Sequence, residues 1–82
     1  MGDNKKLAAV FGEVLRELRL QKGLTQDRLA ELAATERSHI SSLERAEKSP
    51  SLATILSLGD ALGIGAGELI SLVAHRLKTK SR

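Results

Sequence analysis

Apolar residues recur at helical spacing along most of the chain, and no segment alternates apolar and polar residues as a strand does. Glycines, and a proline flanked by serines, interrupt the pattern where helices are expected to end or begin. The spacing predicts an all-α domain of five helices. We expect them at about residues 5–22, 26–33, 36–45, from Ser49-Pro50-Ser51 to Gly63, and after Gly67.

The last predicted helix carries more apolar residues than one packing face needs, namely Leu69, Ile70, Leu72, Val73 and Leu77. A small domain with a single aromatic residue gains stability by burying surface in a dimer. We therefore expect a homodimer through this helix. Its predicted interface residues are Leu69, Leu72, Val73 and Arg76.

The second and third predicted helices form a pair of short helices joined by a tight turn, an arrangement typical of DNA-binding domains. Thr25 is a suitable N-cap for the first of them, and the small Ala30 lets the two backbones approach closely. Their apolar residues are expected in the core. The opposite face of the second carries short hydroxyl groups and positive charge, which suit base edges and phosphates: Arg37, Ser38, Ser41, Ser42 and Arg45. On spacing alone, a merely solvated polar face is an equal alternative.

Length and composition bound the other possibilities. The 82 residues support one domain, which we assign to 1–82 with a core at about 7–73 and a flexible basic tail at 78–82. The net charge of +3 arises in the last twelve residues, because residues 1–70 hold nine basic and ten acidic side chains. Nucleic-acid binding must therefore depend on the side chains of one local face, and not on the net charge of the domain. The absence of cysteine and of an apolar leader or membrane span predicts a cytoplasmic protein.

No residue pattern indicates catalysis or a cofactor. The two histidines, His39 and His75, are far apart in the sequence and have no further ligand at metal spacing, so no metal site is predicted. The chain shows no nucleophile beside a base, and the glycines at 63, 65 and 67 follow no strand that would make a phosphate-binding loop. We expect no enzyme activity and, in a chain of this length, no separate domain for a small-molecule effector.

The segment from about Phe11 to Leu72 resembles the helix-turn-helix family of phage repressors, Cro proteins and xenobiotic-response-element-type regulators. The likeness rests on several motifs together: Leu18-Arg19, Gly23-Leu24-Thr25-Gln26, Leu29-Ala30, Ile40-Ser41-Ser42-Leu43-Glu44-Arg45, Ser49-Pro50-Ser51-Leu52 and Leu58-Gly59-Asp60-Ala61-Leu62-Gly63-Ile64. The stretch Glu36-Arg37-Ser38-His39-Ile40-Ser41 is also similar to controller proteins of restriction-modification operons. The resemblance implies a compact five-helix fold like that of lambda repressor, with residues 36–45 as the reading helix.

The resemblance also implies residue roles. Gln26 clamps a phosphate and braces the reading helix, while Arg37, Ser38 and Ser42 face base edges, with Arg37 the candidate for bidentate hydrogen bonding to guanine. Arg19 and Glu44 match an ion pair that ties the first helix to the third. Ser41 and Arg45 hold the DNA backbone, His39 is a candidate for contact with a phosphate, and Lys48 is a further predicted DNA contact.

Two alanines depart from the family pattern. Ala34 and Ala46 stand where the family often has glycine, and left-handed backbone is costlier for alanine. We therefore expect a turn that is helical at Ala34, and a reading helix that ends differently near Ala46, shifting the loop around Glu47 and Lys48.

The function implied is a transcriptional regulator, associated with the nucleoid, that binds an inverted-repeat operator in double-stranded DNA as a homodimer. An alternative of another class stays open from the sequence. In that alternative the chain is an antitoxin or co-regulator whose main partner is another protein.

Overall fold

Five helices and their connections make up residues 4–80, the part of the chain that the computed structural model describes, and no strand occurs within it. This confirms the all-α prediction. The helices are α1 (Asn4–Gln21), α2 (Gln26–Leu32), α3 (Arg37–Glu44), α4 (Leu52–Ala61) and α5 (Gly65–Lys80).

The boundaries differ from the prediction mainly around α4 and α5. Helix α4 begins at Leu52, because the Ser51 hydroxyl caps it by accepting a hydrogen bond from the Thr54 amide at 3.1 Å. Helix α5 begins at Gly65 and so includes Gly67. It also continues through residues 78–80, which the sequence analysis assigned to the tail. Residues 81–82 of that tail lie outside the described residues.

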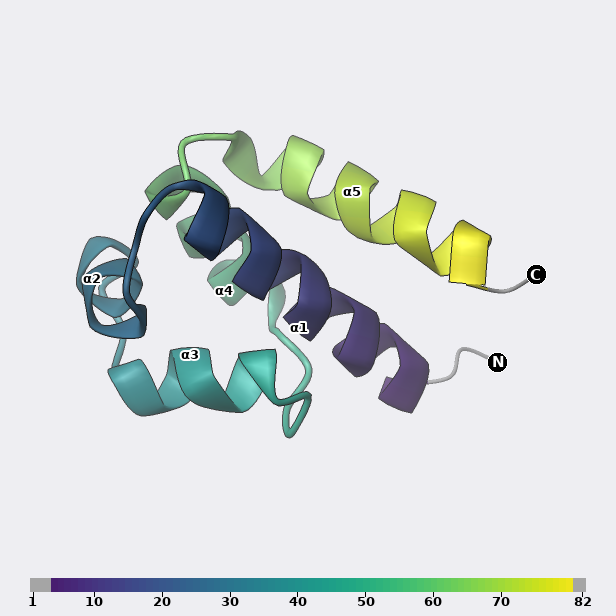
Figure 1. The fold of residues 1–82 in the computed structure, drawn as a ribbon, viewed down its shortest axis with the longest axis horizontal. Helices are drawn as coiled ribbons and strands as arrows, with labels where there is room; N and C mark the ends of the chain where they lie inside the picture. Colours follow the sequence, from purple (N-terminus) through teal and green to yellow (C-terminus); the bar gives the residue numbers. More distant parts are fainter. Residues whose placement is uncertain (1–3, 81–82) are drawn as a thin grey trace.

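Helix α1 lies between α3 on one side and α5 on the other (Figure 1). Its buried face meets apolar residues from the other four helices in one core. The side chains with almost no exposed surface include Leu15, Leu29, Ile40, Leu43, Leu58, Leu62 and Leu69. Helix α2 packs on α3 through Leu29 and Ala30, as the small residue at position 30 predicts.

Two glycines allow helices to approach more closely than any side chain permits. A Cβ atom on Gly12 of α1 would lie 2.6 Å from the carbonyl oxygen of Leu43 in α3. A Cβ atom on Gly59 of α4 would lie 2.4 Å from the amide nitrogen of Ala66 in α5. Both contacts are with backbone, which has little freedom to move away. These glycines therefore fix how near α3 lies to α1 and α5 to α4.

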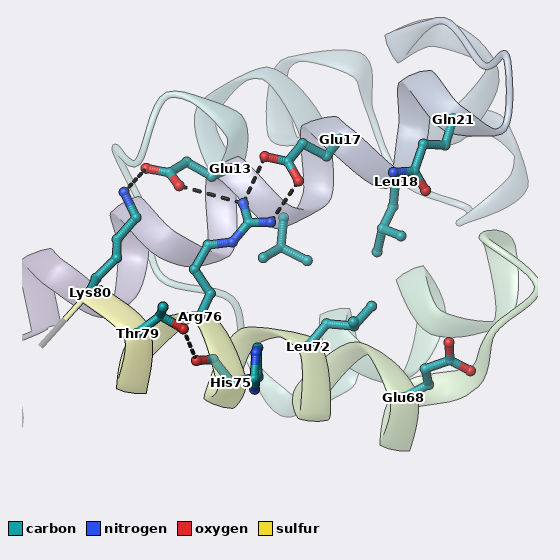
Figure 2. A pocket seen from close by; sticks show the side chains of 11 residues that line it. Glu13, Glu17, Leu18, Gln21, Glu68, Leu72, His75, Arg76, Thr79 and Lys80 are labelled. Atoms are coloured by element: carbon teal, nitrogen blue, oxygen red, sulfur yellow. Dashed lines mark hydrogen bonds and ion pairs between the residues drawn. The ribbon is translucent and has the colours of Figure 1, made fainter. Parts of the chain in front are cut away.

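Ion pairs join α1 to the C-terminal half of α5 across a groove of about 560 Å³ (Figure 2). The Arg76 guanidinium donates to both carboxylate oxygens of Glu17 at 2.7 Å, and Lys80 donates to Glu13 at 3.2 Å. The hydrogen bond from Arg76 lowers the pKa of the Glu17 carboxyl below its ordinary value. Leu18 and Leu72 line the same groove. Helix α5 is thus held to α1 by charge at its end and by apolar burial nearer its start.

Helices α1 to α4 all end in the same hydrogen-bonded motif, in which the residue after the C-cap adopts the left-handed conformation. That residue is Gly23 after α1 and Gly63 after α4, but it is Ala34 after α2 and Ala46 after α3. At Ala34 φ is 56°, and at Ala46 it is 62°.

The expected helical turn at Ala34 and altered helix end near Ala46 are therefore wrong. Each alanine is followed by an amide that bonds back to its helix, from Thr35 to Ala30 and from Glu47 to Ser42, both at 2.9 Å. These hydrogen bonds and the packing of α2 against α3 hold both alanines in a conformation that is unfavourable for a residue with a Cβ atom.

The strained alanines predict stabilising substitutions. Ala34→Gly and Ala46→Gly are each expected to raise the free energy of unfolding by about 0.5–1 kcal/mol, because glycine adopts positive φ freely and this gain exceeds its entropy cost in the unfolded chain. Urea denaturation measures the change. The control is Ala74→Gly in the middle of α5, which is expected to lower stability by about 1 kcal/mol. Equal destabilisation at all three positions would contradict the role of φ.

No helix of the described chain has both the length and the hydropathy to cross a membrane alone. Helices α4 and α5 meet those criteria only when taken together, and they are bent by 107° at the break between them.

Candidate nucleic-acid interface

Two buried side chains on the inward face of α3 determine which side of the helix faces solvent. Ile40 and Leu43 are completely buried, so the residues on the far side of the helix must face solvent. Five side chains on that side line one shallow depression of about 540 Å³: Arg37, Ser38, Ser41, Ser42 and Arg45. They are the five residues that the sequence assigned to this face. The structure therefore places these candidate DNA contacts together.

A buried ion pair locks α3 against α1. Arg19 donates from Nε to Glu44 Oε2 at 2.6 Å and from Nη2 to Glu44 Oε1 at 3.0 Å. Its Nη1 donates to the Leu24 carbonyl oxygen at 2.9 Å, so the loop before α2 is held by the same guanidinium. The hydrogen bond to Glu44 raises the pKa of Arg19 above its ordinary value, although burial opposes this. The structure forms the ion pair that the resemblance implies.

Gln26, the first residue of α2, joins this cluster. Its Nε2 donates to Glu44 Oε1 at 3.1 Å, which supports the predicted bracing of α3. The next residue, Asp27, lies 3.7 Å from the Arg37 guanidinium, at the edge of the depression. Both side chains of that pair are well exposed. The start of α2 is therefore linked to the end of α3 by a part-buried hydrogen bond and to the start of α3 by an exposed ion pair.

The other two predicted contacts lie outside the depression. The His39 ring forms a hydrogen bond with Thr35 Oγ1 at 3.0 Å and lines a separate pocket with residues of α4, on the opposite flank of α3 from Arg37. Lys48 is exposed in the loop between α3 and α4. The structure does not bring either side chain to the centre of the candidate interface.

Sequence reasoning missed Glu47. Arg45 donates to both oxygens of this carboxylate, at 2.8 Å from Nε and 3.0 Å from Nη2, and also to the Ser41 hydroxyl. The hydrogen bond from Arg45 lowers the pKa of Glu47, and the Ser42 hydroxyl and the charge of Lys48 lower it further. Glu47 is therefore ionised at neutral pH. The signal in the sequence was an acidic residue two positions after residue 45, where the predicted reading helix ends.

Comparison with known proteins gives this geometry its context. Residues 10–72 match a family described as the helix-turn-helix domain. The chain belongs to the helix-turn-helix domain family. It is 35% identical over 69 residues to an uncharacterised HTH-type transcriptional regulator of Sinorhizobium fredii, covering 84% of this chain and 86% of the relative.

Controller proteins are also among the relatives of this helix-turn-helix protein. The control protein C.SmaI of Serratia marcescens is 32% identical, with 76% of this chain and 74% of the relative covered. The crystal structure of the restriction-modification controller protein C.AhdI of Aeromonas hydrophila is 45% identical over 76% of this chain and 94% of that chain, with a TM-score of 0.73.

The chain is therefore a helix-turn-helix transcriptional regulator of the controller or xenobiotic-response-element type, in a family of DNA-binding proteins that are not enzymes. The predicted family, fold and class of function are confirmed. Within the described residues, no three His, Cys, Asp or Glu side chains are placed to hold a metal ion.

The fold shows where the residues predicted for the dimer interface lie within the protomer. Leu69 is completely buried and Val73 is 6% exposed, so both belong to the core of the protomer, and Val73 also lines an apolar hollow with residues of α1 and α4. Arg76 is engaged with Glu17 and Glu13 of α1. Leu72 is 39% exposed, and Ile70, which was not predicted at the interface, is 46% exposed. The helical period identified the apolar residues of α5, but not which of them faces the core.

The buried ion pair predicts a large loss of stability when one partner is removed. Glu44→Ala is expected to lower the free energy of unfolding by about 3 kcal/mol, because the Arg19 charge is left buried without its carboxylate. The double variant Arg19→Met with Glu44→Leu is expected to recover most of that loss. Urea denaturation of the three proteins measures both effects.

The matched control is Glu31→Ala, which breaks an exposed ion pair with Arg28. Its expected effect is about 0.5 kcal/mol or less. A loss from Glu44→Ala as small as that of the control would show that α3 is not held by this pair.

Proposed function

We propose that this regulator binds an inverted-repeat DNA operator as a homodimer, with α3 of each protomer in the major groove. The observation that carries the proposal is the single outward face of α3, on which two arginines and three serines line one depression. An α-helix fits the major groove of B-DNA, and these side chains suit its donors and acceptors. Two such helices related by a twofold axis would read half-sites about 34 Å apart.

The residue roles follow from position on α3. Arg37, Ser38 and Ser42 read base edges, with Arg37 donating two hydrogen bonds to a guanine. Ser41 and Arg45 hold the DNA backbone. The start of α2 and the flanks of α3 add phosphate contacts from Gln26, His39 and Lys48.

The proposed dimer uses exposed apolar surface on α4 and α5. Leu52 is 67% exposed and Leu56 is 52% exposed, one helical turn apart on α4. Ile70 of α5 lines an apolar hollow together with Ile55 of α4 and Leu7 of α1. Surface of this kind, on a domain of 82 residues, is suited to burial against a second copy of the chain. Leu72 remains a candidate at the edge of the interface, and Leu69 and Val73 support it from the core.

The proposal also concerns location and control. We place the regulator in the cytoplasm, where it associates with nucleoid DNA. Its occupancy of the operator is then set by its own concentration and by dimerisation, with no small-molecule effector.

Selection of bound duplexes from a random DNA library tests the proposal. At about 150 mM salt, where non-specific phosphate binding is weakened, the expected result is an enriched inverted repeat. Ile70→Glu is the informative variant, because it places a charge in the proposed dimer interface without touching α3. It is expected to sediment as a monomer and to lose affinity for the full repeat, while its circular dichroism spectrum stays helical.

A well-folded protein that enriches no sequence contradicts the proposal. The same protein purifying with a different chain, and showing no DNA retention at low salt, would favour the interaction module instead. An enriched site without repeat symmetry would contradict the dimer alone.

Arg37→Ala tests base reading directly. We expect it to relax specificity at one base pair in each half-site, with a loss of about 1–3 kcal/mol on the operator. Gln26→Ala is expected to weaken binding to all sequences similarly, since it removes a backbone contact. Competition between operator and random duplexes measures the ratio. Equal losses on both duplexes for Arg37→Ala would contradict the assignment of this side chain to a base.

A further inference from the structure

The end of the reading helix carries a carboxylate among the candidate DNA contacts. Glu47 accepts two hydrogen bonds from Arg45, one on each oxygen. Its side chain is 52% exposed, and that of Arg45 is 58% exposed. Ser42 and Lys48, both assigned to the DNA interface, also act on this carboxylate. One acidic group thus occupies the guanidinium with which the proposed complex holds the DNA backbone.

The backbone fixes this position. Ala46 in the left-handed conformation turns the chain back over the end of α3, and the Glu47 amide donates to the Ser42 carbonyl oxygen at 2.9 Å. The backbone of Glu47 is therefore held beside the last turn of α3. Its side chain reaches Arg45 without crossing the core.

The Arg45–Glu47 pair has the same geometry as a contact between an arginine and a phosphate. A guanidinium binds two oxygens of a carboxylate or of a phosphate in the same planar, bidentate manner. The group with which Arg45 would hold the DNA backbone is therefore occupied in the free protein by an anion of the same shape. DNA must displace this anion before Arg45 can bind a phosphate.

We propose that Glu47 is an intramolecular competitor of DNA phosphate for Arg45, and that it sets the regulator's affinity for DNA backbone. The inference rests on the proposed function only in requiring that α3 faces DNA. Once displaced, the carboxylate lies near the phosphates and is repelled by them. Glu47 therefore lowers binding to any duplex, which limits occupancy of non-specific DNA.

The chain offers a closely matched control for this residue. Glu17 is also paired with both oxygens on one arginine, Arg76, and its side chain is 52% exposed, as that of Glu47 is. The Glu17 pair lies between α1 and α5, and α5 is on the opposite side of α1 from α3 (Figures 1 and 2). Replacing either glutamate by glutamine changes the net charge equally.

Binding to a random-sequence duplex is measured by fluorescence anisotropy across a salt series, for the wild type, Glu47→Gln and Glu17→Gln. We expect Glu47→Gln to bind about threefold to tenfold more tightly at about 100 mM salt. Its plot of log affinity against log salt is expected to be steeper by up to about one unit, because Arg45 then binds a phosphate without freeing a carboxylate that keeps a cation nearby. Glu17→Gln is expected to stay within about twofold of the wild type, since its charge is remote. Circular dichroism checks that each protein is folded.

The same substitution in an Arg45→Gln background separates competition from bulk charge. There the gain from Glu47→Gln is expected to fall to that of the Glu17→Gln control, because the arginine that Glu47 occupies is absent. An equal gain in both backgrounds would overturn the inference in favour of a general charge effect. No gain, or a loss, from Glu47→Gln alone would overturn it by showing that the carboxylate does not compete with DNA.

The random duplex keeps this inference distinct from the proposed operator. A gain on random DNA without any enriched repeat in the selection would leave the role of Glu47 standing and overturn the operator. An enriched repeat without a gain on random DNA would support the operator and overturn the role of Glu47. If no protein in the series binds DNA at low salt, both are overturned.

Discussion

The Arg19–Glu44 ion pair is the interaction on which the rest of the arrangement depends. It lies where α1, the loop before α2 and the last turn of α3 meet, and its guanidinium reaches all three through Glu44 and the Leu24 carbonyl. Two buried charges of this kind are tolerated only when their hydrogen-bonding groups are satisfied. Gln26 supplies a further donor to Glu44, and the described residues contain no buried side-chain polar atom without a partner. The orientation of α3 is therefore specified by direction-dependent hydrogen bonds as well as by apolar packing.

Close backbone packing adds a second constraint on α3. Gly12 brings α1 against the carbonyl groups of Leu43 and Glu44, so α3 has no room to move toward α1. The left-handed residues Ala34 and Ala46 then set where the chain enters and leaves the helix pair. These joints are held by long-range packing at a local conformational cost. A helix that is held at both ends loses little freedom when it binds, and this favours affinity for a partner of fixed shape.

The composition does not show which charged side chains are paired with one another in the fold. The described arginines on the outer face of α3 are paired with carboxylates, Arg37 with Asp27 and Arg45 with Glu47. A second set of ion pairs joins α1 to α5 and places the basic end of α5 in structural contacts. The net charge of +3 thus says little about the field at α3. Electrostatic recognition in so small a domain is local, and it depends on which carboxylate each guanidinium faces.

The sequence by itself determined the five helices and the composition of the α3 face, because both depend on short-range periodicity and on residue types that end helices. The family motifs also indicated the Arg19–Glu44 pair, which spacing alone does not. Tertiary structure decided the rest. Leu69 and Val73 lie in the core while Ile70 is exposed, since the helical period marks apolar residues without saying which stripe meets α1. Ala34 and Ala46 adopt positive φ against their local preference, because hydrogen bonds and packing with other helices outweigh the cost at one residue. Glu47 faces Arg45 for the same reason, since only the backbone turn at Ala46 brings its carboxylate back over the end of α3.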